Sequence, residues 1–178
     1  MDIPQLWVDV LRRVQQEYPG AIIAGGSLRD LYYGRPVKDV DIFIPTDPDD
    51  PWAEQVTKDP NWVVTKIKRP GYALPDNTDR EIYEVEEIDI LGTQFDFIYC
   101  SPESMDLLTF DMSICQIAFD GTTWITTKAF DETARTKVIT VEIQQHPQRK
   151  IDRIARMTAK FPEFTIKDEP FGTNHKRV

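Results

Sequence analysis

The sequence has no long apolar run and no recognisable leader for export. A membrane-spanning helix takes about 20 consecutive apolar residues, and no stretch of this chain comes near that length. The first residues form an amphipathic pattern and lack the basic head and apolar centre of a signal peptide. We therefore expect a cytoplasmic protein that makes no contact with a membrane.

Histidine and cysteine are scarce, which weakens the case for two classes of site. With only two histidines, His146 and His175, a histidine-based zinc site or a serine–histidine triad has little support. The two cysteines, Cys100 and Cys115, have neither the spacing of metal ligands nor the number that a disulfide framework needs. We expect both to be reduced thiols.

An excess of positive charge is missing as well. The chain has 30 acidic residues against 21 lysines and arginines, which gives a net charge of −9. A general electrostatic attraction to nucleic acid is therefore not expected. The segment 149–160 departs from this balance, because it holds several basic residues and a single acid, Asp152.

The 178 residues suffice for one domain with a core of its own. Turn signals and apolar alternation predict strands at 21–24, 37–44 and 62–68, and hairpins over 81–100 and 112–126 that turn at Gly92-Thr93 and Asp120-Gly121. Helical patterns lie at 4–18, 27–33 and 52–58 and from Pro147 onward, and the tail after Phe161 is expected to be irregular. The predicted fold class is α/β (α+β), a mixed sheet of about five strands with helices on one face.

Two adjacent glycines separate the strand at 21–24 from a helical pattern. Gly25, Gly26 and Ser27 turn the chain into a helix that stops at Gly34. Such a turn presents backbone N–H groups that favour an anion, above all phosphate. On its own the glycine pair indicates no more than a tight turn.

The strand at 37–44 adds two carboxylates. Asp39 and Asp41 are two residues apart, so their side chains share one face, and a divalent cation would remove their repulsion. Oxygen ligands of this kind suit magnesium, or manganese, together with substrate phosphates. Asp96 on the 81–100 hairpin would complete a two-metal site with ions about 3.5–4 Å apart. Asp89 on the partner strand is the second choice, and a solvated strand face is the alternative for the Asp-x-Asp pair.

The stretch "GGSLRDLYYGRPVKDVDIFI" resembles the signature of the polymerase β nucleotidyltransferase superfamily. More narrowly, it is similar to the head domain of bacterial poly(A) polymerases and class II CCA-adding enzymes. Those proteins share Gly-Gly-x-x-Arg-Asp, a glycine followed by a basic residue, and Asp-x-Asp between apolar residues. The matching positions here are Gly25, Gly26, Arg29, Asp30, Gly34, Asp39 and Asp41. The resemblance implies a head domain over 1–145, followed by a basic helix and C-terminal arm over 146–178.

The resemblance also implies a reaction, in which a nucleoside monophosphate passes from a nucleoside triphosphate (NTP) to an acceptor hydroxyl and pyrophosphate leaves. Asp39, Asp41 and Asp96 would bind the magnesium or manganese ions, and Asp96 would orient or deprotonate the acceptor. The nucleotide would be held by Gly25, Gly26, Ser27, Arg29, Asp111, Arg149, Arg153 and Arg156. Three other interpretations stay open: Arg29 as a structural partner of Asp30, Asp111 as a packing residue, and the three arginines of 149–156 as a solvated helix face.

The segment "FDMSICQIAFD" resembles the family's Arg-Arg-Asp-Phe-Thr-Ile-Asn-Ala block but departs from it at three positions. Thr109 and Phe110 replace the two arginines, and Cys115 replaces the asparagine. These departures leave two alternatives, a nucleotide-binding or regulatory module with weak turnover and a subunit that needs a partner chain for its acceptor site. The acceptor stays open among RNA such as a tRNA 3′ end, a small molecule and a protein, as do the base and the oligomeric state.

Overall fold

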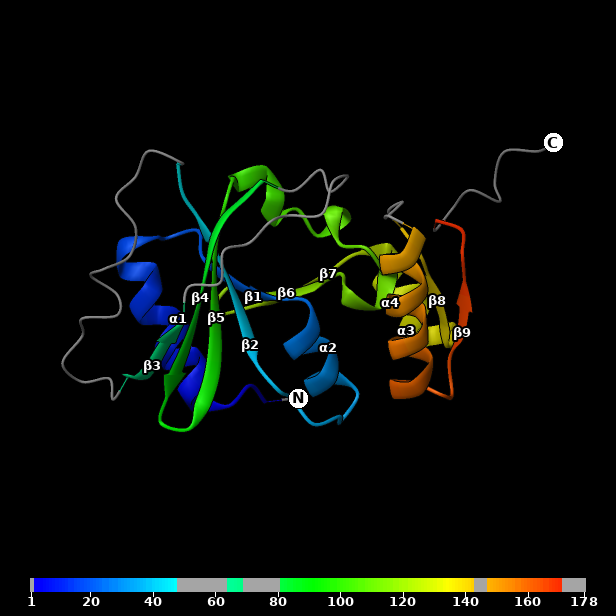
Figure 1. Ribbon diagram of the computed structural model, residues 1–178, viewed down its shortest axis with the longest axis horizontal. Helices are drawn as coiled ribbons and strands as arrows, with labels where there is room; N and C mark the ends of the chain where they lie inside the picture. Colours follow the sequence, from blue (N-terminus) through cyan, green and yellow to red (C-terminus); the bar gives the residue numbers. More distant parts are fainter. Residues whose placement is uncertain (1, 48–63, 69–80, 143–146, 171–178) are drawn as a thin grey trace.

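A computed structural model describes residues 2–47, 64–68, 81–142 and 147–170, with the backbone alone for 64–68. One mixed sheet has the strand order β3-β4-β5-β2-β1-β6-β7 (Figure 1). Only β2 and β5 run parallel, and the other neighbours are antiparallel. The strands are β1 (Ile22–Ala24), β2 (Val40–Pro45), β3 (Val64–Lys68), β4 (Ile82–Ile90), β5 (Thr93–Cys100), β6 (Ile117–Phe119) and β7 (Trp124–Thr126). The predicted class, α+β with a mixed sheet, is confirmed, with seven strands in the sheet instead of about five.

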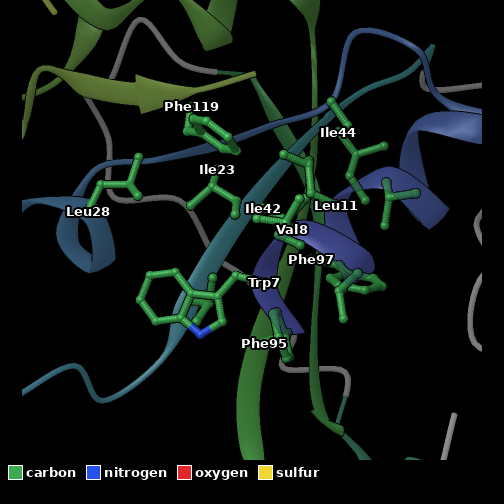
Figure 2. Close-up of a cluster of buried hydrophobic side chains, with 14 of the residues drawn as sticks. Trp7, Val8, Leu11, Ile23, Leu28, Ile42, Ile44, Phe95, Phe97 and Phe119 are labelled. Atoms are coloured by element: carbon green, nitrogen blue, oxygen red, sulfur yellow. The ribbon is translucent and has the colours of Figure 1, made fainter. Parts of the chain in front are cut away.

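Helix α1 (Gln5–Glu17) covers one face of this sheet. Its apolar stripe, which includes Trp7 and Leu11, packs against side chains that alternate along the central strands, such as Ile42 and Phe97 (Figure 2). Burying a side chain of this size contributes about 1.5–3 kcal/mol. This packing fixes which face of β2 and β5 points into the main core.

The opposite face therefore carries the alternate residues of the same strands. Phe43 and Ile98 lie in a second core cluster there. Three short 3₁₀ helices contribute to that cluster, η1 (Pro102–Met105), η2 (Leu107–Thr109) and η3 (Ser113–Cys115). The strand expected from residue 112 consequently begins only at Ile117, because η3 precedes it. By the same alternation, Asp41 and Asp96 belong to this second face.

The remaining helices are α2 (Gly26–Tyr32), α3 (Lys128–Thr136) and α4 (Pro147–Lys160). The sequence did not predict α3, nor the two-stranded parallel sheet of β8 (Val138–Thr140) and β9 (Thr165–Lys167). The expectation of an irregular tail after Phe161 is therefore wrong at β9. The three residues of β9 are too short a stretch for a strand pattern to be recognised in the sequence. The strand forms because it pairs with β8, which is distant in the chain.

The hairpin of β4 and β5 turns one residue earlier than predicted. Its two turn residues are Leu91 and Gly92, both with positive φ (52° and 80°), as in a type I′ turn. A leucine rarely adopts this conformation, which is why Gly92-Thr93 was the more natural prediction. The shift matters because it decides which residue of β4 lies opposite Asp96.

The predicted helix at 52–58 lies outside the described residues, as does the first part of the predicted strand at 62–68. The rest of that strand is confirmed as β3. In the described part of the chain, no helix is both long enough and apolar enough to cross a membrane.

Candidate functional site

The structure brings two of the three predicted carboxylates side by side. Asp41 in β2 lies directly opposite Asp96 in the parallel neighbour β5, so both side chains leave the sheet on the same face. Asp39 comes one residue before β2 begins. All three carboxylates are half-buried. Asp41 and Asp96 are far apart in the sequence, and the pairing of β2 with β5 brings them together.

The electrostatics of this group are those of crowded anions. Burial, followed by the charges of Asp39 and Asp96, raises the pKa of Asp41 to about 7. Burial also raises the pKa of Asp96, with smaller contributions from Asp39 and Glu87 that a hydrogen bond from Gln94 partly offsets. A bound cation would relieve this repulsion.

Two of these carboxylates are engaged by neighbouring side chains. Asp39 accepts from Lys38 at 2.9 Å, and Asp96 accepts from the Gln94 amide at 3.0 Å. Among the described residues, no three acidic, histidine or cysteine side chains already converge on a metal position. The hydrogen bonds of Asp39 and Asp96 would have to be exchanged for contacts with an ion if the three carboxylates are to share one.

The glycine turn approaches the carboxylates closely. A Cβ on Gly26 would lie 3.6 Å from Oδ2 of Asp41. Gly25 has φ 80°, and a Cβ there would lie 2.9 Å from the Phe110 ring. Its N–H donates to the carbonyl of Ile117 at 2.9 Å. This N–H is therefore engaged within the sheet, and the assignment of Gly25 to the nucleotide remains a prediction.

Ser27 occupies the first turn of α2 beside Gly26. The residue is only 2% exposed. Its Oγ is buried and has no hydrogen-bond partner among the residues that the structure describes. A buried hydroxyl without a partner costs free energy, and a hydrogen bond to a bound water or to a polar ligand would offset that cost.

Arg29 is buried within the protein and is not extended toward solvent. Its guanidinium donates to Asp30 at 2.8 Å and to the sulfur of Cys115 at 3.2 Å. Lys160 of α4 forms an ion pair with the same Asp30. These contacts favour the structural interpretation of Arg29, although its Nη2 lies 3.7 Å from where a Cβ of Gly26 would be.

The three predicted arginines of α4 fall in different environments. Arg153 reaches the site, where it donates to both oxygens of Asp111 (3.0 and 3.3 Å) and to the sulfur of Cys115 (3.4 Å). Its charge opposes the rise in the pKa of Asp41. Arg149 and Arg156 are exposed. The basic helix therefore brings one of its arginines into this group of side chains.

Sequence reasoning missed Glu87 and Lys38. Glu87 lies directly opposite Asp96, on the far side from Asp41. A turn at Gly92-Thr93 would have placed Asp89 there, but Asp89 instead accepts a hydrogen bond from the Gly92 N–H at 3.0 Å. Counting back along β4 from a turn at Leu91-Gly92 places Glu87 opposite Asp96.

Solved structures of CCA-adding enzymes share this fold. The Bacillus stearothermophilus enzyme in complex with CTP matches with a TM-score of 0.59 and 21% identity, over 95% of this chain and 42% of its own. The Thermotoga maritima enzyme complexed with tRNA matches with a TM-score of 0.62 and 18% identity, over 94% and 40%. A CCA-adding enzyme with ATP gives 0.61 and 17%, over 93% and 41%.

This chain thus spans less than half the length of those proteins. No protein-family model matches the sequence, and no curated protein does. At such identities the likeness concerns the fold. The predicted resemblance to the polymerase β-like nucleotidyltransferase head is confirmed at that level.

Proposed function

We propose that this protein is a nucleotidyltransferase that moves a nucleoside monophosphate from an NTP to an acceptor hydroxyl. The observation that carries the proposal is the position of Asp41. It lies between the Gly26 turn on one side and Asp96 on the other. This order matches what the reaction needs, namely a place for phosphates, then metal ligands, then a carboxylate near the acceptor.

The phosphate side is assigned to the turn and its neighbours. The Ser27 hydroxyl, which lacks a partner among the described residues, would donate to a phosphate oxygen. Gly26 permits close approach because it has no side chain. Arg153 would add positive charge. It would first have to divide its contacts between Asp111 and the phosphate, or break its ion pair with Asp111. The Ser27 hydroxyl is the group whose role a phosphate explains best.

The carboxylates have the chemistry of a magnesium or manganese site. Asp39, Asp41 and Asp96 supply hard oxygen donors. Burial, together with repulsion from neighbouring carboxylates, raises the pKa of Asp41 and of Asp96, and a divalent ion would remove that repulsion. Such ions, when bound, would neutralise negative charge on the reacting phosphates. Asp39→Ala combined with Asp41→Ala should abolish the part of the NTP-induced rise in melting temperature that depends on metal.

The transfer step is a displacement at the α-phosphorus. The acceptor oxygen forms a bond to phosphorus while the bond to the bridging oxygen breaks, and pyrophosphate leaves with that electron pair. The hydroxyl proton passes to the Asp96 carboxylate and then to water.

The decisive experiment compares Asp96→Asn with Asp89→Asn in assays with each α-labelled NTP. Asp96→Asn should leave NTP affinity within a few-fold and slow transfer by about two orders of magnitude or more. Asp89→Asn should change little, because Asp89 serves the turn. Measurable transfer that neither change affects would rule out the three-carboxylate mechanism.

A nucleotide-binding module with little turnover is the second candidate. It is favoured by Phe110, whose ring packs against Gly25 and Phe43 where the resembling family has an arginine. This candidate predicts a melting-temperature rise with NTP and metal but no labelled product with any acceptor. A subunit completed by a partner chain would instead gain transfer when that partner is supplied.

A further inference from the structure

The end of α4 contacts two buried charges of α2. The two helices lie side by side (Figure 1), and the last residue of α4, Lys160, forms an ion pair with Asp30. The Arg29 guanidinium lies over the ring of the next residue, Phe161, with Cζ 5.4 Å from the ring centroid. Arg29 and Asp30 are each 5% exposed, whereas the Lys160 side chain is 32% exposed. Lys160 therefore connects the surface of the protein with a buried ion pair.

Two of the three guanidinium nitrogens of Arg29 are held by the protein. Nε donates to Asp30 at 2.8 Å, and Nη1 donates to the sulfur atoms of Cys115 at 3.2 Å and Met157 at 3.6 Å. Because a guanidinium is planar and its donors have fixed directions, these contacts also fix the direction of Nη2. This third nitrogen has no hydrogen-bond partner among the described residues.

Nη2 of Arg29 is directed at the glycine turn. It lies 3.7 Å from the position that a Cβ of Gly26 would take, and Oδ2 of Asp41 lies 3.6 Å from the same position. Burial raises the pKa of Asp41, and the charge of Arg29 opposes that rise. The Oγ of Ser27, the residue after Gly26, is likewise unused within the described part of the chain. Arg29 and Ser27 thus each retain a donor that a phosphate could use.

Lys160 decides how much of the Arg29 charge is left for a ligand. Oδ1 of Asp30 accepts from Arg29, and Oδ2 accepts from Lys160. Without Lys160, the single carboxylate would balance the guanidinium. With it, two cations share one anion, and one positive charge is in excess. Charges interact more strongly in a buried environment than in water, so this excess acts on any anion that lies at Nη2.

We propose that Lys160 is a positioning residue for the nucleotide, which acts through Asp30 to hold Arg29 Nη2 and its positive charge toward the phosphates of the NTP. This inference rests on the proposed function, because it takes the turn at Gly26 as the phosphate side of the site. Lys160 binds Asp30 and needs no contact with the ligand. The end of α4 thereby raises the nucleotide affinity of a site built on α2 and β2.

A purely structural role for Lys160 predicts a different result. An ion pair that only ties α4 to α2 stabilises the fold, and its loss lowers the melting temperature of the protein without ligand. The folded protein would then bind NTP as tightly as before. The NTP affinity of a folded variant therefore separates the two roles.

The test compares Lys160→Met with Lys150→Met. Both lysines belong to α4 and each forms an ion pair with an aspartate, but Lys150 pairs with Asp168 of the C-terminal arm. Lys160→Arg keeps the charge, and Arg29→Met removes the group through which Lys160 acts. Calorimetry with magnesium and each NTP measures affinity, thermal unfolding shows that each variant is folded, and α-labelled NTPs measure transfer.

We expect Lys160→Met to weaken NTP binding about tenfold. The KM for NTP should rise by a similar factor, with kcat within a few-fold of wild type. Lys160→Arg should restore the affinity, and Lys150→Met should leave it unchanged. Arg29→Met should lose at least as much affinity as Lys160→Met. If Lys160→Met does not fold, Lys160→Gln, which keeps a donor for Asp30 without the charge, gives the same comparison.

Three results would overturn the inference while NTP still binds to the wild type. They are an unchanged affinity in the folded Lys160 variant, an equal loss of affinity in Lys150→Met, and an Arg29→Met protein that binds NTP as the wild type does. NTP binding that depends on Lys160, in a protein that labels no acceptor, would overturn the proposed reaction and leave the inference in place. A wild-type protein that binds no NTP would overturn both.

Discussion

Replacement of Ser27 can distinguish a role of its hydroxyl in binding from a role in the stability of the fold. Ser27→Ala should weaken NTP binding by about tenfold, the usual worth of a hydrogen bond to a charged group. It should not lower the melting temperature of the protein without ligand, because the hydroxyl has no partner among the described residues. Calorimetric titration with NTP and thermal unfolding without it measure the two effects.

The matched control is Ser113→Ala. Ser113 Oγ is buried, lies 2.6 Å from Thr133 Oγ1 and accepts from the Thr140 N–H at 2.9 Å. Its loss should destabilise the fold by about 1–3 kcal/mol and leave NTP affinity unchanged. If Ser27→Ala behaves like Ser113→Ala, the Ser27 hydroxyl is structural and its assignment to phosphate fails.

In the metal-free protein, the ionised Asp41 carboxylate lowers the free energy of unfolding. Its folded pKa is about 7, against about 3.9 for an ordinary aspartate. Because the folded pKa is raised, stability is retained below about pH 4 and is lost progressively as the pH rises to about 7. The shift of about three pKa units corresponds to at most about 4 kcal/mol, and the partial exposure of Asp41 reduces this value. Asp41→Asn should therefore stabilise the metal-free protein by about 1–2 kcal/mol at pH 8 and by almost nothing at pH 4.

Urea unfolding in the presence of a chelator, at both pH values, measures this difference. The same variant should lose the stabilisation that magnesium and NTP give the wild type at pH 8. A destabilised variant at pH 8 would mean that the Asp41 carboxylate makes a favourable contact in the folded protein.

Among the elements of the fold, the turn that begins α2 depends on Gly25. Its φ of 80° is strained for any other residue, and a Cβ would lie 2.9 Å from Phe110 Cε1. Gly25→Ala should cost roughly 2–4 kcal/mol from strain and overpacking together. Gly34→Ala is the control, since Gly34 also has positive φ (65°) but no described atom lies within 4 Å of the added Cβ.

Gly34→Ala should cost only about 1–2 kcal/mol, the strain alone. Chemical denaturation of both variants gives the comparison. Equal losses would show that the contact with Phe110 is relieved by a small movement of the ring.

The β4–β5 turn allows a test of the register that places Glu87 opposite Asp96. Leu91 is 65% exposed and adopts φ 52°. Because asparagine tolerates this conformation and Asn-Gly is the preferred type I′ pair, Leu91→Asn should stabilise the protein by about 0.5–1 kcal/mol. Were Leu91 a strand residue beside a Gly92-Thr93 turn, asparagine would instead destabilise it.

For the molecule as a whole, the question is whether α4 folds together with the sheet. Met157 is 3% exposed and belongs to the second core cluster, together with Phe161. Met157→Ala should lower the free energy of unfolding by about 2–5 kcal/mol within a single transition. Ile151→Ala, on the same helix but 60% exposed, should have little effect.

Fluorescence and circular dichroism followed in one denaturant titration measure both variants. A separate early transition of α4 would support 146–178 as a unit distinct from residues 1–145. That division remains a prediction.

Local patterns were enough for the parts of the candidate site that are close together in the chain. The Asp39–Asp41 spacing, the glycine turn and the strand that carries Asp41 all depend on backbone periodicities of a few residues. The resemblance that these residues support was confirmed at the level of the fold. Asp96 is recognisable in the sequence as an acid between two phenylalanines, and the pairing of β5 with β2 places it beside Asp41.

The contacts between distant segments could not be obtained in the same way. Whether β5 pairs with β2, and whether Glu87 or Asp89 faces Asp96, depends on strand order and on a turn shifted by one residue. The burial of Arg29 against Cys115 depends on η3 and α4 closing over α2. These arrangements are selected because they bury two apolar faces of one sheet at once, a condition that no short stretch of sequence contains.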